Sequence, residues 1–449
     1  MKIQTICFFP IVKYQAELFA SIADEWSKKG YIKNVIFICP SINSFLYLKK
    51  NKKFTVYFLP ELFLEYSQNY KKTVNGAKVM GSITEFEINK YELLKNWGYK
   101  KRLPSVEQLD YEACIYFELW EEFLKNNHID IFMIWNGYIL PQRSLLQHLN
   151  SKGSKVMYFE NGYEPETFVV DPVGINAKSS FSKSSLDKEM KNPNWIDSTQ
   201  VKEGARKKHH TRLLYYCLNR AYLLFLKCND YYGQLLRYEY SHSVVEKLGA
   251  LFNKLNRNKE VPGEFIFFPL QVITDSQLID NFNASQESVL RSAVNVISSI
   301  NVGRKEPLYL VVKDHPRQEV KKYIKLLKKK YASPYTIFLD SGDTTQLVAN
   351  SLCVITINSS VGYHALKLRK DVLVMGESIY TGTGLALKVE SEDHLKQLVL
   401  KLAEGHKFIK EARIQHFIER YNSYCYPLNA TSITLQNLRI RVHELEGGQ

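Results

Sequence analysis

Along the chain, short apolar runs alternate with longer segments of helical spacing. Apolar runs lie at 2–9, 34–39 and 54–58, and Tyr14–Lys29 between the first two has helical spacing. Strands that alternate with helices are typical of a parallel sheet with helices on its faces. The same alternation starts again at Phe265, so we expect two α/β units.

Between these two series the pattern is less regular. We expect an amphipathic helix at Tyr111–Asn127 and strands at Ile129–Trp135 and Lys155–Phe159. The polar, tyrosine-rich stretch at 60–103 is interpreted as an insertion, and 203–257 is basic and aromatic with a helical pattern.

The second series predicts a sheet with strands at 265–269, 308–313, 336–339, 353–357 and 371–375. A helical stretch at 276–300 follows the first strand, and helices are expected at 392–403 and 408–421. The sequence therefore predicts two Rossmann-like domains with a cleft between them. Their expected bounds, and those of a helical tail, are 1–257, 258–405 and 406–449.

Composition points to a globular protein that either has an anionic partner or is simply a basic soluble protein. Of the 449 residues, 45% are apolar and 13% aromatic, and 60 Lys and Arg against 46 Asp and Glu give a net charge of +14. The basic residues at 203–257 interleave with Leu, Tyr and Phe, which suits an anionic membrane surface. A packed helix pair with a solvated basic face is the alternative, and both stay open.

Cysteine usage and hydropathy bear on location. The seven cysteines are scattered without a C-x-x-C pair, which argues against a zinc site or a disulfide framework. No apolar stretch reaches the ~20 residues that span a bilayer, and the N-terminus lacks a secretory pattern. We expect a cytoplasmic protein whose membrane contacts, where present, are peripheral.

Two polar residues follow the first strand of the second series. Gln271 and Asp275 come directly after the strand at 265–269. A carboxylate at the C-terminal edge of a parallel sheet is a candidate nucleophile or base. Asp-Ser-Gln-Leu also suits the start of a helix, and on its own this pattern favours Asp275 as an N-cap.

Two further strands end in groups suited to phosphate. Lys313 and His315 follow one of them, and a histidine there can also protonate a leaving group. Ser359 and Ser360 precede a predicted helix, whose N-terminus favours anions. The structural alternatives are a turn capped by His315 and ordinary N-capping by a serine.

A polar loop at 159–180 follows the strand at 155–159. Glu160, Asn161 and Asn176 lie in it, at the strand end where open α/β sheets bind ligands. The alternative is a structural loop whose Asx side chains cap turns. That alternative applies equally to Asp171 in the same loop.

A second loop, at 376–384, brings two more candidates. We expect Glu377 to bind ribose hydroxyls and Tyr380 to line the cleft. Because parallel strands end at one edge, Asp275, His315 and the serine pair should meet there. The sequence predicts a pocket with one carboxylate and a set of phosphate-binding groups.

Other chemistries lack their motifs. The chain contains no G-x-x-x-x-G-K-[ST] and no G-x-G-x-x-G after a strand, which argues against P-loop and dinucleotide-binding enzymes. It has no D-x-D motif of a metal-dependent GT-A transferase. No basic-aromatic module of known spacing supports nucleic-acid binding.

Four stretches together resemble a known family. They are FENGY…DPVGIN at 159–176, PLQVITDSQL at 269–278, KDHP at 313–316 and INSSVGYHAL…GESIYTGTGLA at 357–386. In their order and spacing, the chain resembles the bacterial capsule polysaccharide synthesis family that contains the β-Kdo transferases. The resemblance implies an α/β GT-B fold with two Rossmann-like domains, a cleft and C-terminal helices.

The resemblance also implies a mechanism. The enzyme would use CMP-Kdo without a metal or cofactor and retain the anomeric configuration, building capsule or O-polysaccharide. The carboxylate of the family's Q-x-x-x-D corresponds to Asp275, which would attack the anomeric carbon. His315, Ser359 and Ser360 would stabilise the departing CMP phosphate, and Glu160 would act as the base for the acceptor.

Other implied contacts concern the sugar and the acceptor. Lys178 and Lys313 would pair with the Kdo carboxylate, whereas Gln271, Asn161, Asn176 and Tyr380 would lie on the sugar and acceptor side. Implied partners are a nucleotide-sugar donor and a glycan or glycolipid acceptor, at the cytoplasmic face of an anionic inner membrane. Nucleic acid is not an expected partner.

Several alternatives stay open. The segment Glu160–Thr167 contains no Arg, where similar sequences place one, and this leaves the acceptor undecided. The donor could be another CMP-sugar, such as a CMP-sialic acid. A protein of a different class, a non-catalytic membrane-associated capsule-assembly protein, would use the basic stretch at 203–257 instead.

Overall fold

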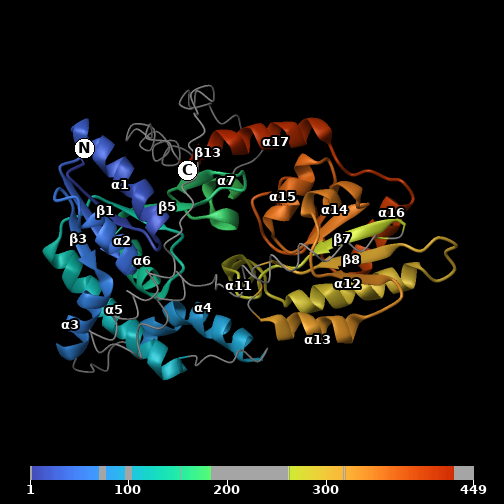
Figure 1. Cartoon of the computed structure of the whole chain (residues 1–449), viewed down its shortest axis with the longest axis horizontal. Coiled ribbons are helices and arrows are strands. Elements are labelled where there is room, and N and C mark those ends of the chain that lie inside the picture. The colour runs from blue at the N-terminus through green and yellow to red at the C-terminus, as the bar shows by residue number, and fades with distance from the viewer. Residues whose placement is uncertain are drawn as a thin grey trace.

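The computed structural model describes residues 3–69, 77–96, 104–151, 153–183, 261, 263–316, 318 and 320–428. These residues form two α/β halves, each built around its own sheet (Figure 1). The basic stretch at 203–257, on which the membrane and scaffold interpretations depend, lies outside the described residues.

The first sheet has the strand order β13-β6-β5-β4-β1-β2-β3. Strands β1 to β5 are parallel, whereas β6 is antiparallel to β5 and β13 is antiparallel to β6. Every residue of β1 is buried, as expected of a strand inside a covered parallel sheet. The strands from the first part of the chain are β1 (Thr5–Phe9), β2 (Asn34–Cys39), β3 (Thr55–Phe58), β4 (Ile131–Trp135), β5 (Lys155–Asn161) and β6 (Thr167–Asp171).

Helices connect these strands. Ser105 starts α5 earlier than the predicted Tyr111, because its Oγ accepts the Gln108 N–H at 3.2 Å and the Gln108 side chain accepts the Ser105 N–H. Helices α3 and α4 lie in the described part of the stretch interpreted as an insertion, and α4 packs against α5, α6 and α11. The helices are α1 (Lys13–Lys28), α2 (Ile42–Leu48), α3 (Leu59–Asn69), α4 (Ala77–Asn96), α5 (Val106–Asn126), α6 (Leu140–Ser151), the 3₁₀ helix η2 (Asn176–Lys178) and α7 (Ser180–Lys183).

The second sheet is parallel throughout, with the order β12-β11-β10-β7-β8-β9. Its central strand β7 is buried along its whole length. The strands are β7 (Phe265–Pro269), β8 (Tyr309–Lys313), β9 (Thr336–Leu339), β10 (Cys353–Thr356), β11 (Asp371–Val374) and β12 (Leu387–Lys388).

The stretch predicted as one helix at 276–300 is two helices. Phe282 has an extended backbone that ends α11, and Ser285 caps α12 by accepting the Ser288 N–H at 3.0 Å. The helices of this half are α11 (Ser276–Asn281), α12 (Gln286–Ile300), α13 (Lys321–Tyr331), α14 (Thr344–Asn350), α15 (Ser360–Lys367) and α16 (Glu392–Ala403).

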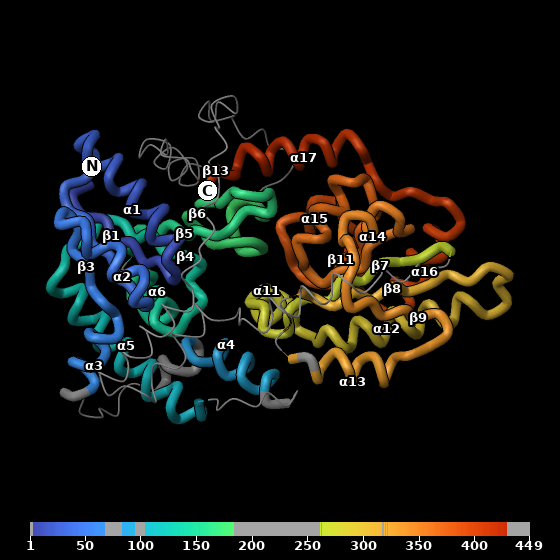
Figure 2. Tube along the Cα trace, in the orientation of Figure 1, coloured from blue at the N-terminus to red at the C-terminus, as the bar shows by residue number. Residues whose placement is uncertain are grey.

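The last described segment returns to the first half. Helix α17 (Glu411–Tyr424) runs back from the second half, and β13 (Cys425–Pro427) then joins the first sheet beside β6 (Figure 2). The tail expected at 406–449 is therefore not helical alone. Phe181 of the first half packs against Phe417, Tyr421 and Tyr424, so aromatic side chains join the halves here.

Each sheet has one point at which the strand order reverses, between β1 and β4 in the first and between β7 and β10 in the second. Ligands of open α/β sheets bind outside the carboxyl ends of the strands at such a point. Two Rossmann-like units with a C-terminal helix that crosses back confirm the predicted α/β GT-B class.

Candidate active site

Asp275 stands at the start of α11, beyond the end of β7. Its backbone is extended and its Oδ1 accepts the Gln277 N–H at 2.9 Å, so the predicted N-cap is confirmed. Burial raises the pKa of the Asp275 carboxyl, while hydrogen bonds from the Gln277 backbone and the Gln271 side chain act in the opposite direction. The cap does not test whether Asp275 is also a nucleophile, and that role stays a prediction.

Gln271 joins the two strands at the reversal point of the second sheet. Its Nε2 donates to Asn358 Oδ1 at 3.0 Å, and its Oε1 accepts the Asn358 N–H at 3.2 Å. The residue is only 4% exposed. Gln271 therefore clamps the end of β7 to the loop after β10, where both its amide groups are used, and an additional contact with sugar stays a prediction.

The serine pair begins α15. Ser359 is its N-cap, with Oγ accepting the Val361 N–H at 3.2 Å, and Ser360 is the first helical residue. Tyr380 is fully buried and donates its hydroxyl to the Ser359 carbonyl at 2.7 Å. Tyr380 thus does not line the cleft as predicted; it supports the turn that leads into α15.

Lys313 and His315 follow β8. Lys313 is 9% exposed, and burial lowers the pKa of its ammonium group, which Asp314 and Asp343 partly counteract. His315 is half-buried, and its carbonyl accepts the Gln318 N–H at 3.0 Å. Both residues are at the predicted strand end, and their binding of phosphate or sugar carboxylate stays a prediction.

Glu160 lies near the end of β5, at the edge of the first sheet. Its carboxylate accepts the Asn161 N–H at 2.7 Å and the Asn136 Nδ2 at 3.1 Å. The pKa of Glu160 is raised to about 7, mainly by burial and in smaller part by the charge of Asp275, while these two hydrogen bonds act in the opposite direction. Carboxylates from the two halves are therefore close enough to influence each other.

The first half supplies a polar turn that the sequence analysis did not assign to the site. Asn136 and Gly137 both have positive φ, of 62° and 84°, directly after β4. The Asn136 side chain donates to Glu160 and accepts the Tyr138 N–H at 3.0 Å. The Asn-Gly pair after a strand was the available signal, because such pairs favour left-handed turns.

Asp171 organises the loop after β6. Buried Asp171 accepts the backbone N–H groups of Val173, Gly174 and Ser180 and the Tyr424 hydroxyl, at 2.7–3.0 Å. The turn-capping alternative for Asp171 is confirmed.

The two asparagines of this loop differ in place. Asn176 starts η2 with φ of 51°, and its carbonyl accepts the Ser179 Oγ at 2.6 Å. Asn161 is exposed, and its Oδ1 accepts the Tyr14 hydroxyl at 3.3 Å. Neither arrangement tests their predicted contacts with sugar or acceptor.

Two predicted ligand-binding residues have protein partners. Lys178 Nζ contacts Asp280 at 3.1 Å, so its predicted pairing with a sugar carboxylate competes with this ion pair. Exposed Glu377 forms an ion pair with Lys388, and its N–H donates to the Asn281 carbonyl at 3.1 Å. Their contacts with sugar and ribose stay predictions.

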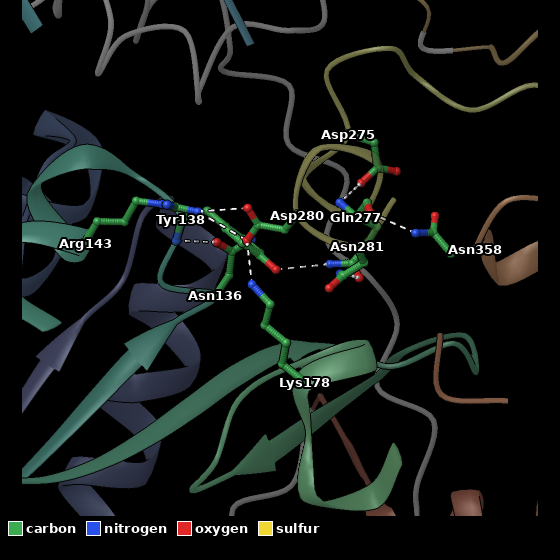
Figure 3. Close-up of polar contacts among 9 residues, drawn as sticks. All are labelled: Asn136, Tyr138, Arg143, Lys178, Asp275, Gln277, Asp280, Asn281 and Asn358. Carbon is green, nitrogen blue, oxygen red and sulfur yellow. Dashed lines mark hydrogen bonds and ion pairs between the residues drawn. The ribbon is translucent and has the colours of Figure 1, made fainter. Parts of the chain in front are cut away.

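Side chains on α11 connect the two halves (Figure 3). Asp280 contacts Arg143 of α6 and Lys178, and Gln277 Nε2 donates to the Tyr138 hydroxyl at 3.4 Å. Arg143 and Asp280 were absent from the sequence-based site, because single charged residues on predicted helices carry no signal of a partner elsewhere in the chain.

The described residues form neither a metal-binding cluster nor a membrane-spanning helix. They contain no group of three or more His, Cys, Asp and Glu side chains arranged to hold a metal ion. None of the helices formed by these residues has the length and apolar content needed to cross a bilayer.

Relatives of the chain were found by sequence and by structure. Protein FixF of Sinorhizobium fredii (strain NBRC 101917 / NGR234) is 25% identical over 65% of this chain and 58% of its own length. The capsule polysaccharide export protein KpsS of Escherichia coli is 26% identical over 55% of this chain and 66% of its own length. The chain thus spans less than two thirds of either relative.

Among solved structures, Thermosulfurimonas dismutans KpsC, described as a beta Kdo 2,7 transferase, is similar with a TM-score of 0.38 and 16% identity. The match covers 80% of this chain and 97% of that one. A family model described as capsule polysaccharide biosynthesis protein matches residues 135–425, which is well over half of the chain. The chain therefore belongs to the capsule polysaccharide biosynthesis protein family.

Proposed function

We propose that the chain is a retaining β-Kdo transferase that uses CMP-Kdo to build a bacterial surface polysaccharide. The observation that carries the proposal is the pair Glu160 and Asp275. These carboxylates come from the two halves of a GT-B fold, and the charge of Asp275 helps to raise the pKa of Glu160 to about 7. Family membership and the four sequence stretches that resemble β-Kdo transferases support it.

In the first step, a carboxylate oxygen of Asp275 bonds to the anomeric carbon of Kdo. The bond from that carbon to the phosphate oxygen breaks, and CMP leaves with the electron pair. Ser359, Ser360 and the N-terminus of α15 then stabilise the phosphate charge, together with His315. No metal is needed, because the leaving phosphate already has this set of donors.

In the second step, the acceptor hydroxyl displaces Asp275 from the anomeric carbon and loses its proton to Glu160. Two displacements at one carbon retain the configuration. A base is most effective when its pKa lies near the working pH, and the pKa of Glu160, about 7, meets this condition.

The decisive experiment compares Asp275→Asn with Asp275→Ala. Asparagine caps a helix as well as aspartate does, so Asp275→Asn removes the nucleophile and keeps the start of α11. We expect both variants to lose transfer from CMP-Kdo by roughly 10³-fold or more, with CMP binding retained. Near-normal turnover by Asp275→Asn would show that Asp275 is not the nucleophile.

A second measurement looks for the intermediate. Without acceptor, the intact mass of the wild-type protein incubated with CMP-Kdo should increase by one Kdo unit, whereas Asp275→Asn should show no increase. A parallel incubation with CMP-sialic acid tests the donor. Release of CMP from that donor but not from CMP-Kdo would reassign the sugar, and release from neither would contradict the proposed function.

A further inference from the structure

Asp280 ties α11 to the first half of the molecule. Arg143 Nη2 lies 3.2 Å from both carboxylate oxygens of Asp280, and Lys178 Nζ lies 3.1 Å from Oδ2 (Figure 3). The Asp280 and Arg143 side chains are 13% and 19% exposed, whereas Lys178 is 55% exposed. Arg143 is therefore the stronger partner, because solvent screens an exposed ion pair.

The position of Arg143 is fixed by aromatic packing. Its guanidinium carbon lies 4.3 Å from the centre of the Phe86 ring on α4 and 5.6 Å from that of Tyr138. Ile279 of α11 packs against the cluster of Phe86, Tyr138 and Ile175. The ion pair thus lies beside a small apolar contact between the halves.

The second half holds the same helix from the other side. Asn358 Nδ2 donates to the Gln277 carbonyl at 2.8 Å, and the Glu377 N–H donates to the Asn281 carbonyl at 3.1 Å. Because α11 starts at Asp275, any movement of the helix relative to the first half moves this carboxylate as well.

Hydrogen bonds run from Asp275 to Glu160 through this helix. Asp275 accepts the Gln277 N–H, and the Gln277 side chain donates to the Tyr138 hydroxyl. The Tyr138 N–H donates to Asn136, whose amide donates to Glu160. Attachment of α11 to the first half therefore sets how the two carboxylates lie relative to each other.

We propose that Asp280 is a positioning residue. Its ion pair with Arg143, supported by Lys178, holds α11 against the first half and fixes the separation between Asp275 and Glu160. The kinetic consequence rests on the proposed function, whereas the structural consequence can be measured on the protein alone.

The protonation of Glu160 provides that measurement. The titratable groups that interact with it are Asp275 on α11, Tyr138 after β4 and Tyr163 after β5. If α11 leaves the first half, water reaches Glu160 and Asp275 moves away. Both changes lower the pKa of Glu160 from about 7 toward its ordinary value of 4.5.

The free energy of unfolding in urea, measured at several pH values, reports the pKa of Glu160 without any substrate. Because the folded-state pKa is raised, the wild type loses stability relative to Glu160→Gln as pH rises from 4.5 to about 7, and the difference then levels off. In an Asp280→Asn background, we expect the same difference to level off at least about one pH unit lower.

The variant Arg143→Gln shows whether the pKa of Glu160 changes because α11 has moved or only because a nearby charge has been removed. Removing the negative Asp280 lowers the pKa of Glu160 by its field alone, whereas removing the positive Arg143 raises it by its field alone. If the ion pair positions α11, both variants lower the pKa. Opposite shifts, or no shift in either variant, would overturn the proposal.

Kinetics add a second readout. We expect Asp280→Asn to lower kcat by roughly 10- to 100-fold, because the two carboxylates are misplaced. The KM for CMP-Kdo should not rise, because the phosphate-binding groups of the second half are intact. Asp280→Glu should recover most of the loss. The matched control is Lys330→Gln, which breaks the 2.6 Å ion pair with Glu287 inside the second half and should change neither readout.

Discussion

The edges of the two sheets that border the cleft are built from different chemistry. In the second half, Asp275 and Ser359 each cap a helix, and Gln271 is clamped to Asn358, so these polar groups also hold the local fold together. In the first half, Glu160 is a carboxylate whose pKa, about 7, lets it change charge near neutral pH.

This difference indicates that one edge binds the sugar donor and the other edge binds the acceptor. A departing phosphate is stabilised best by donors that are already oriented, because no reorganisation is then needed during the reaction. An acceptor hydroxyl needs a group that takes up a proton, which only a titrating residue provides. The edge of the second sheet, which carries the serine pair and the N-terminus of α15, is therefore expected to hold CMP. The edge of the first sheet, which carries Glu160, is expected to serve the acceptor.

Apart from the Asp275 variants, the largest expected effect is at Glu160. Glu160→Gln should reduce transfer by about 10²- to 10⁴-fold, the usual contribution of a general base. CMP-Kdo binding and formation of the Kdo adduct should persist, because both depend on the other edge. Steady-state transfer and the intact mass after incubation with donor measure the two steps. Loss of the adduct as well would place Glu160 in the first step.

The transfer rate and CMP binding should differ in their dependence on pH. Because a base must be deprotonated, we expect the kcat of the wild type to fall about tenfold per pH unit below pH 7 and to be level above it. The affinity for CMP should not show this fall below pH 7. A transfer rate that is flat between pH 5 and 8 would remove Glu160 as the base.

Breaking the clamp at the fixed edge should destabilise the fold. Asn358→Ala removes the acceptor of Gln271 Nε2 and the donor to the Gln277 carbonyl, at a cost of about 1–3 kcal/mol. Urea unfolding measures this cost. Asn295→Ala is the control, because Asn295 is exposed and its hydrogen bonds to Glu392 are long, so its change should stay within about 0.5 kcal/mol. Equal costs in the two variants would mean that the clamp adds no stability.

The smallest expected effect separates capping from ligand binding in the serine pair. Ser359→Ala removes the N-cap of α15 and should cost about 1 kcal/mol of stability. Ser360→Ala lies inside the helix and should leave stability nearly unchanged while raising the KM for CMP-Kdo. An unchanged KM in both variants would show that the serines serve the helix alone.

Several features of the site could be predicted from local sequence. Asp-Ser-Gln-Leu starts a helix and Ser359 caps one, because capping depends on a few neighbouring residues. The division of 276–300 into two helices and the strand β6 were missed, because their signals are weak apolar periodicity around polar loops. Tyr380 was placed on the cleft because its loop follows a strand, but packing buries it behind Ser359.

The sequence by itself determined the two α/β units and the strand ends at which Asp275, His315 and Ser359 lie. Hydrophobic periodicity and caps are local, and parallel strands bring their ends to one edge. Only the tertiary structure decided that Asp280 meets Arg143 and that Glu160 is affected by Asp275. Those pairs lie more than a hundred residues apart, and the Asp275 charge that helps to raise the pKa of Glu160 reaches it only when both halves are packed together.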